Sequence, residues 1–246
     1  MQAVELSVYP LISLLHKENL GDPHPVLAGG ELYVSHRFAS ESERWLRSEL
    51  AEAGLADRSQ LADFTGMLSI IQSARIEFYG WVTTHDDSYS LLAAAHGRNA
   101  FALIRRGEYV SFGRVSPERL AEALVSQLPD VRAGHGESIS VRAAELGSTN
   151  GVVLRGASGT TRSEPARRLN TLFRTPRRGI AKLYAARRDD AGNRVRSREW
   201  LDLFDLPEGR WAVQTTTARG ERMITAVPAP PALIAARLTE LLRSVR

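Results

Sequence analysis

The feature that most constrains the fold is a pattern that occurs twice in the chain, 113 residues apart. Residues 98–128 read RNAFALIRRGEYVSFGRVSPERLAEALVSQL, and residues 209–242 read GRWAVQTTTARGERMITAVPAPPALIAARLTELL. In both, a Gly-Glu turn leads into a strand that ends before a helix opened by proline. The separation of 113 holds for Gly107 and Gly220, Pro117 and Pro230, and Leu120 and Leu233. The shared register predicts a duplicated unit, and chance matching of short apolar runs is the alternative.

Each copy of the pattern extends backwards into further elements. Alternating apolar residues and turn signals predict four strands in each half, at 75–83, 88–95, 100–105 and 109–115, and at 179–188, 194–205, 210–217 and 222–227. Apolar residues three and four positions apart predict helices at 7–16, 40–54, 61–71, 116–128, 163–173 and 230–245. A further short strand is expected at 31–37. Each half is therefore predicted to run helix, four strands, helix.

Neither four-stranded meander can bury both of its faces alone. We therefore expect one continuous α+β body whose central antiparallel β-sheet joins two meanders by pseudo-twofold symmetry. A single domain spans 1–246, with an N-terminal half at 1–129, a connector at 130–163 and a C-terminal half at 164–246. The connector is rich in Gly, Ser, Thr and Ala, and its one expected element is a short strand at 138–142.

Composition narrows the classes of function. The 246 residues include no cysteine, which excludes disulfides and thiolate chemistry and favours a reducing compartment. No apolar run approaches the roughly 20 residues that cross a bilayer, and the N-terminus lacks the basic region of a signal peptide. We therefore expect a cytoplasmic protein without membrane insertion.

The net charge of +4 is unevenly distributed along the chain. Residues 1–150 hold 13 basic and 19 acidic side chains, whereas residues 151–200 hold 13 basic and 4 acidic ones. The arginine-rich segment 155–198 has Phe173 and Tyr184 between its arginines and Trp200 just after them, which suggests a nucleic-acid-binding surface as one interpretation. The alternative interpretation is that these arginines form a solvated basic face without a ligand. The preference for arginine over lysine is typical of a GC-rich genome.

Catalytic signatures are missing from the sequence. The six histidines have no partner at an established metal spacing, and Asp86-Asp87 is better explained as a turn. Gly134-His135-Gly136 lacks the third glycine of a dinucleotide fingerprint, and Ser158 lacks the context of a nucleophile elbow. We expect neither an enzyme nor a protein with a metal or cofactor.

The order and spacing of several segments resemble the EspG family, the cytosolic specificity chaperones of actinobacterial ESX (type VII) secretion systems. In the first half these are Leu6-Ser7 before a short helix, the loop around Pro23 and Pro25, and the helix end EAGL at 52–55. In the second half they are LYAARR at 183–188, LFDLPEGRW at 203–211 and the closing stretch 233–242. The resemblance covers nearly the whole chain.

The resemblance implies a central antiparallel sheet flanked by two helical bundles, with a quasi-twofold relation between the halves. It implies a chaperone that binds PE–PPE-like heterodimers, covers an aggregation-prone apolar tip and keeps them soluble for export, with the secretion machinery as a further expected partner. It further implies a grip by the sheet and the C-terminal bundle, which indicates the second meander. The apolar contacts expected there are Tyr184, Leu201, Phe204, Trp211 and Val213, with Arg187, Arg194 and Arg196 on the rim. For each apolar residue, a place in the core is the alternative.

Overall fold

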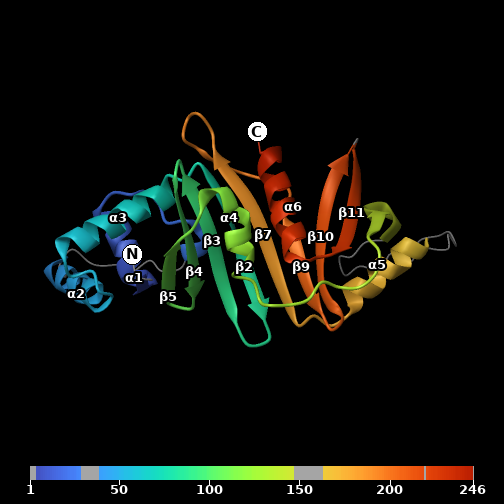
Figure 1. The fold of residues 1–246 in the computed structure, drawn as a ribbon, viewed down its shortest axis with the longest axis horizontal. Helices are drawn as coiled ribbons and strands as arrows, with labels where there is room; N and C mark the ends of the chain where they lie inside the picture. Colours follow the sequence, from blue (N-terminus) through green and yellow to red (C-terminus); the bar gives the residue numbers. More distant parts are fainter. Residues whose placement is uncertain (1–3, 29–38, 147–162, 219, 246) are drawn as a thin grey trace.

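One large antiparallel sheet runs through the molecule (Figure 1). The computed structural model describes residues 4–28, 39–146, 163–218 and 220–245. Within them the strand order is β1-β5-β4-β3-β2-β7-β9-β10-β11-β6, and β8 pairs with β7. The strands are β1 (Val4–Ser7), β2 (Ile76–Thr84), β3 (Ser88–His96), β4 (Asn99–Arg106), β5 (Tyr109–Arg114), β6 (Ile139–Arg142), β7 (Gly179–Arg188), β8 (Arg194–Arg196), β9 (Leu201–Leu206), β10 (Gly209–Ala218) and β11 (Glu221–Pro228). The strands expected at 75–83, 88–95, 100–105, 109–115, 179–188, 210–217 and 222–227 are thus confirmed within two residues.

The helices begin and end where local signals place them. They are α1 (Val8–Lys17), α2 (Ala39–Glu52), α3 (Arg58–Gln72), α4 (Leu120–Val125), α5 (Glu164–Arg174) and α6 (Pro231–Ser244), with 3-10 turns η1 (Pro25–Leu27), η3 (Pro117–Arg119) and η4 (Ala143–Leu146). α3 begins three residues earlier than its apolar pattern, because the Asp57 carboxylate caps it by accepting a hydrogen bond from the backbone N–H of Ser59 at 2.7 Å. Ser163 caps α5 in the same way.

The two meanders join at their first long strands. β2 and β7 pair antiparallel from Ile76–Arg187 to Thr84–Gly179. From this junction the order of strands outward is β2-β3-β4-β5-β1 on one side and β7-β9-β10-β11-β6 on the other. Each side therefore ends in a short strand, β1 or β6, that precedes its meander in sequence. The short strand expected at 138–142 is β6, while the strand expected at 31–37 falls outside the described residues.

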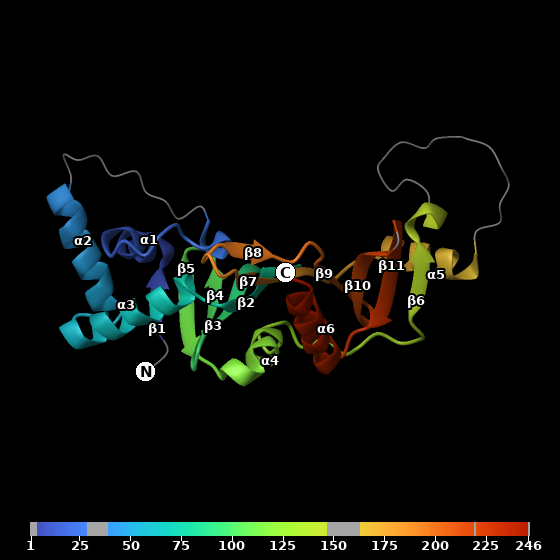
Figure 2. The same cartoon turned by 90° about the horizontal axis from the view of Figure 1, so that it is seen from above.

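Helices cover the two faces of the sheet unequally (Figure 2). On one face, α4 and α6 lie side by side across the junction, over a core that includes Phe78, Leu91, Leu183 and Leu203. On the opposite face, α1, α2 and α3 cover the end that β1, β5 and β4 form. α5 covers the other end on that same face, over β10, β11 and β6. Among the described residues no helix lies over the middle of this second face, which we call the open face.

The prediction of one strand over 194–205 was wrong, because a bulge divides it into β8 and β9. Both pieces pair with the same edge of β7, but residues 197–200 loop out between them. Ser197 donates its backbone N–H to the Ala185 carbonyl at 2.8 Å, and its hydroxyl bonds to the N–H of Ala185 and to the carbonyl of Glu199. The hydroxyl thus replaces a ladder partner, so a polar residue at a buried position allows the strand to bend.

Candidate functional site

The open face carries exposed aromatic and aliphatic side chains at its centre. Four large apolar residues are exposed among the described residues, and three of them are here: Trp81 at 40%, Ile180 at 43% and Trp200 at 36%. Half-buried Tyr184 and Phe204 lie on the same face, by the register that pairs Ile180 with Phe204 and Tyr79 with Tyr184. These five residues, Trp81, Ile180, Tyr184, Trp200 and Phe204, form what we call the aromatic patch. Soluble proteins seldom leave such a cluster uncovered unless it binds something.

The rings of the patch contact one another across the junction of the two meanders. Tyr184 on β7 stacks on Tyr79 of β2, with ring centroids 5.3 Å apart and an interplanar angle of 17°. Trp81 meets the edge of Tyr184 at 5.9 Å, and Trp200 lies 6.4 Å from Tyr184 on its other side. Such contacts hold rings in fixed orientations. The patch is therefore a preformed surface to which both meanders contribute.

Cations lie over several of these rings. The Arg196 guanidinium is 4.9 Å from the Tyr184 centroid, the Lys182 ammonium is 4.6 Å from that of Trp200, and Arg177 is 4.0 Å from that of Phe204. All three cations are exposed. The patch is therefore apolar at its centre and basic around it.

A buried ionic cluster lies beside the patch, next to Tyr79, the residue on which Tyr184 of the patch stacks. The Glu77 carboxylate on β2 binds Arg194 of β8 and lies 3.4 Å from His24 Nε2 in the loop before η1. His24 Nδ1 accepts a hydrogen bond from the Val26 N–H at 3.2 Å, and His24 Nε2 also lies 3.0 Å from Arg194 Nη2. Arg194 also lies over the Tyr79 ring at 4.6 Å. The cluster thus ties both meanders and η1 to the tyrosine that supports Tyr184.

Burial sets the protonation of this cluster. Burial lowers the pKa of His24, and the nearby charges of Arg194 and Arg188 lower it further, against the raising effect of Glu77. Burial alone would raise the pKa of Glu77, but the hydrogen bond from His24 and the charge of Arg194 outweigh it and hold that pKa below its ordinary value. The pair is therefore a neutral imidazole against a carboxylate near neutral pH.

The structure divides the residues predicted for partner contact into four groups. Tyr184, Phe204 and Arg196 lie on the open face within or over the aromatic patch. Leu201, Trp211 and Val213 are 1%, 4% and 5% exposed and fill the cores beneath α6 and α5, so they offer a partner no surface. Arg194 turns inward to Glu77 and is no free rim charge. Arg187 is exposed on the opposite face, since Leu183 and Ala185 of the same alternation pack beneath α6.

The residues predicted to contact a partner do not include Trp81, Ile180, Lys182 and Trp200, which the structure exposes in or beside the aromatic patch. Trp81 comes from the first meander, to which the resemblance assigned no contact. Ile180 and Lys182 alternate with Ala181 and Leu183, so the signal for a two-sided strand was present. What the alternation lacked was any indication of which side stayed uncovered.

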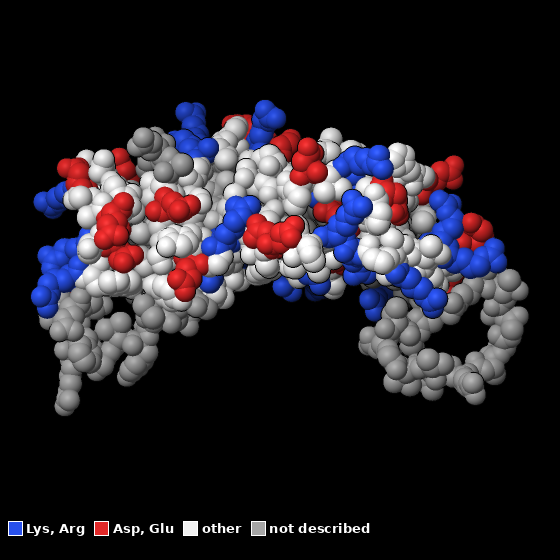
Figure 3. Space-filling view, turned by 90° about the horizontal axis from the view of Figure 1, so that it is seen from below, with Lys and Arg blue, Asp and Glu red and all other residues white. Residues whose placement is uncertain are grey.

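The described part of the arginine-rich segment, residues 163–198, does not form one continuous basic surface. Arg187 and Arg196 lie on opposite faces, and Arg194 is taken up by Glu77. Arg155 and Arg162 fall outside the described residues. Figure 3 shows more acidic side chains over the first meander and more basic ones over the second, on a molecule arched between its two ends. The basic residues of the described part therefore make separate local contacts and do not form one shared binding surface.

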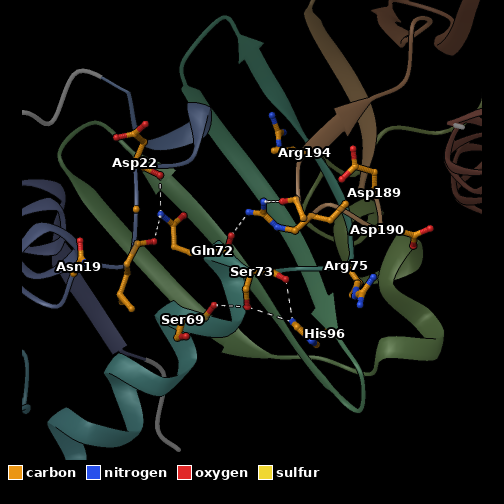
Figure 4. Close-up of a pocket in the computed structure, with 14 residues that line it drawn as sticks. Asn19, Asp22, Ser69, Gln72, Ser73, Arg75, His96, Asp189, Asp190 and Arg194 are labelled. Carbon is orange, nitrogen blue, oxygen red and sulfur yellow. Dashed lines mark hydrogen bonds between the residues drawn. The ribbon is translucent and has the colours of Figure 1, made fainter.

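A polar cavity of about 830 Å³ lies between the loop after α1, the end of α3 and the β7–β8 hairpin (Figure 4). The Gln72 amide donates to the Asp22 carbonyl at 2.7 Å, and the Arg188 guanidinium binds the carbonyls of Gln72 and Gly192. The charged residues around it balance, with Arg75, Arg188 and Arg194 against Asp22, Asp189 and Asp190. The hydrogen bonds around this cavity hold the β7–β8 hairpin against the end of α3.

The described part of the chain offers neither a metal site nor a membrane-spanning helix. None of its clusters of His, Asp and Glu could hold a metal ion. None of its helices is long and apolar enough to cross a membrane.

Known sequences, structures and families show what this chain is similar to. No curated protein sequence matches the chain. Among solved structures, the chain is similar to the Mycobacterium tuberculosis type VII secretion system chaperone EspG5, solved in complex with a PE25–PPE41 dimer. The TM-score is 0.66 at 14% sequence identity, with 100% of this chain and 97% of that chain covered, so the two share a fold. The model of the EspG family matches residues 11–240, and the chain therefore belongs to the EspG family.

Proposed function

We propose that this protein is a cytoplasmic chaperone of a type VII secretion system, which binds a PE–PPE-like heterodimer and keeps it soluble for export. The observation that carries the proposal is the aromatic patch on the open face of the sheet. A chaperone of this kind must bury an apolar surface of its client, and the patch is a preformed apolar surface of the right character. Membership of the family and the likeness to EspG5 support the choice of client.

The patch has the composition of a binding hot spot. Tyrosine and tryptophan are enriched at the centres of interfaces, because a large ring buries much apolar area at little cost in side-chain entropy. A standard interface buries about 800 Å² on each partner, so the client would reach beyond the patch onto neighbouring strands. We assign the contacts to Trp81, Ile180, Tyr184, Trp200 and Phe204. No enzymatic step is part of the proposal.

We further propose that the two meanders and their helices descend from one duplicated unit with a pseudo-twofold relation, and that the helices act as two bundles around the sheet. The mirrored strand order about the β2–β7 junction supports this. The client site would then lie on the pseudo-twofold axis, where only one of the two halves supplies the bulge that carries Trp200.

Co-expression with PE–PPE pairs from the same genome tests the proposal. We expect one pair to co-purify as a complex that survives size-exclusion chromatography at high salt, and to be insoluble without the chaperone. The Trp81→Ala and Trp200→Ala variants should fold normally and lose the complex. Tyr109→Ala is the matched control, because Tyr109 is 58% exposed at a distant turn.

Two results would contradict it. The first is the absence of a complex with every pair. The second is salt-sensitive retention of nucleic acid by the purified protein, which would favour a basic binding surface instead.

A further inference from the structure

The cations over the aromatic patch have few counter-ions within the chain. Lys182 Nζ lies 3.9 Å from Asp202 Oδ1, which makes it half of an ion pair. Arg177 donates to the Phe173 carbonyl at 3.5 Å, and neither Arg177 nor Arg196 belongs to an ion pair among the described residues. Three cations therefore surround the patch, and the carboxylate that pairs with one of them, Lys182, is that of Asp202.

Asp202 is already engaged by the chain itself. Its Oδ2 accepts a hydrogen bond from the Trp200 indole N–H at 2.7 Å. Burial raises the pKa of Asp202, opposed by that hydrogen bond and by the charges of Lys182 and Arg177. The next carboxylate, Glu199, accepts from Gln214 and from the backbone N–H of Thr217. Neither acid is therefore free to neutralise Arg196.

A client that covers the patch must also cover these cations. Cation–π contacts at exposed sites are weak, so the guanidinium groups can leave the rings at little cost. A guanidinium that loses its water without gaining an anion is strongly unfavourable, whereas a carboxylate can bind it through two hydrogen bonds. A purely apolar tip would leave Arg196 in that unfavourable state.

We propose that the client carries carboxylate side chains beside its apolar tip, and that Arg196 and Arg177 bind them when they swing off Tyr184 and Phe204. This rests on the proposed function and specifies the chemistry of the partner. The arginines then have two roles. In the free chaperone they shield the rings from other apolar surfaces, and in the complex they select an acidic rim and speed its approach.

The test measures association rates of the client identified by co-expression, at about 50 mM and about 500 mM NaCl. We expect the wild-type rate to fall about tenfold at the higher salt, and Arg196→Glu to slow association about tenfold at the lower salt. Arg177→Glu should slow association less than Arg196→Glu, because the negative charge of Asp202 already offsets part of the charge of Arg177. Arg98→Glu is the matched control, an exposed arginine in the β3–β4 turn, and should leave the rate within about twofold.

A charge exchange makes the test specific. Acidic residues near the tip of the client are changed to lysine one at a time, and we expect one of these changes to restore the rate of Arg196→Glu. Circular dichroism melts of each variant confirm that the fold is intact.

Failure of this inference differs from failure of the proposed function. If Trp200→Ala loses the complex while Arg196→Glu and Arg177→Glu associate like the wild type, the acidic rim is wrong and the chaperone surface stands. If Trp200→Ala and Trp81→Ala retain the complex, the patch is not the site, so the contact assignment and this inference both fail. The chaperone function itself fails only if no PE–PPE pair forms a complex with the wild type.

Discussion

The two meanders have the same strand order but different coverings. On the side of the sheet that includes the open face, α1–α3 and η1 cover the first meander up to Tyr79, whereas α5 covers only the outer strands of the second. β7 and β9, the inner strands of the second meander, therefore supply most of the aromatic patch, and the first supplies Trp81. The difference teaches that a repeated strand order fixes the sheet but leaves the site to the elements added around it.

Equivalent positions beside the central turns show a second difference. Ala95 and Ala100 face each other next to the β3–β4 turn, and both are buried under α4. The positions next to the β9–β10 turn hold Asp205 and Arg210, joined by two hydrogen bonds of 2.6 and 2.8 Å. Arg210 also donates to the Pro129 carbonyl at 3.0 Å. The second meander thus depends on a buried ion pair where the first uses packed alanines.

The largest expected effect comes from breaking that ion pair. Asp205→Ala leaves Arg210 buried without its counter-charge and should lower the free energy of unfolding by about 3–5 kcal/mol, measured by chemical denaturation. The Asp87→Ala variant removes the exposed partner of Arg106 in the first meander and should cost at most about 1 kcal/mol. The double variant Asp205→Ala/Arg210→Ala, which copies the first meander, should recover part of the loss. Equal stability of Asp205→Ala and the wild type would contradict the role of the pair.

The junction between the meanders should be nearly as sensitive. A Cβ at Gly80 would lie 2.3 Å from the Lys182 carbonyl oxygen and 2.7 Å from Leu183 Cδ2. Gly80→Ala should therefore force β2 and β7 apart and cost about 3 kcal/mol in a thermal or denaturant melt. Gly113→Ala in β5 is the control, because a Cβ there meets nothing within 4 Å. We expect that control to be as stable as the wild type, and a harmless Gly80→Ala would show that the junction yields easily.

A smaller effect should appear as a dependence of stability on pH. His24 is buried and its pKa is lowered in the folded protein, so the unfolded chain takes up the proton first. Stability is then fully present above the ordinary pKa of 6.5 and is lost as the pH falls from there toward the folded pKa. The contribution of Glu77, whose pKa is also lowered, is present above its ordinary pKa of 4.5 and is lost only as the pH falls from there toward the lower folded pKa. Denaturant melts at intervals from about pH 7.5 to about pH 3 should show both losses.

His24→Gln separates the two groups. Glutamine cannot titrate, yet it can accept from Val26 and donate to Glu77. The loss that begins near pH 6.5 should disappear in this variant, while the loss at lower pH remains. An unchanged first loss would assign it to another group.

The smallest effect concerns the bulge that only the second meander has. Ser197→Ala removes the hydroxyl that bonds to the Ala185 N–H and the Glu199 carbonyl, at an expected cost of about 1 kcal/mol. Client binding should weaken as well, because the bulge positions Trp200 in the patch. Ser88→Ala, in β3 at an exposed position, is the control for a strand without a bulge. Unchanged stability and binding would show that the backbone alone holds the bulge.

Local signals were sufficient to predict most elements. The Gly-Glu turns, the prolines before α4 and α6 and the alternation in β2 and β7 each act within a few residues, so the sequence alone locates them. The two exceptions have different causes. Ser197 divides a strand only because it bonds to Ala185 on a neighbouring strand. α4 is shorter than its apolar pattern for a local reason, because η3 takes its first turn.

The candidate site could be predicted only in part. Of the residues predicted to contact a partner, Tyr184, Phe204 and Arg196 lie on the open face, whereas Leu201, Trp211 and Val213 are core residues. Trp81 joins the patch through a pairing with Lys182 that spans about a hundred residues of sequence. No pattern within one segment contains that pairing.

The sequence by itself determined the turns, the strands, the helices and membership of a family. Tertiary structure decided which face of the sheet stays open. The physical reason is that alternation divides a strand into two sets of side chains but does not say which set a helix will cover. That choice depends on where α4 and α6 pack, and they pack over Leu183 and Leu203, which leaves Tyr184, Ile180 and Trp200 on the open face.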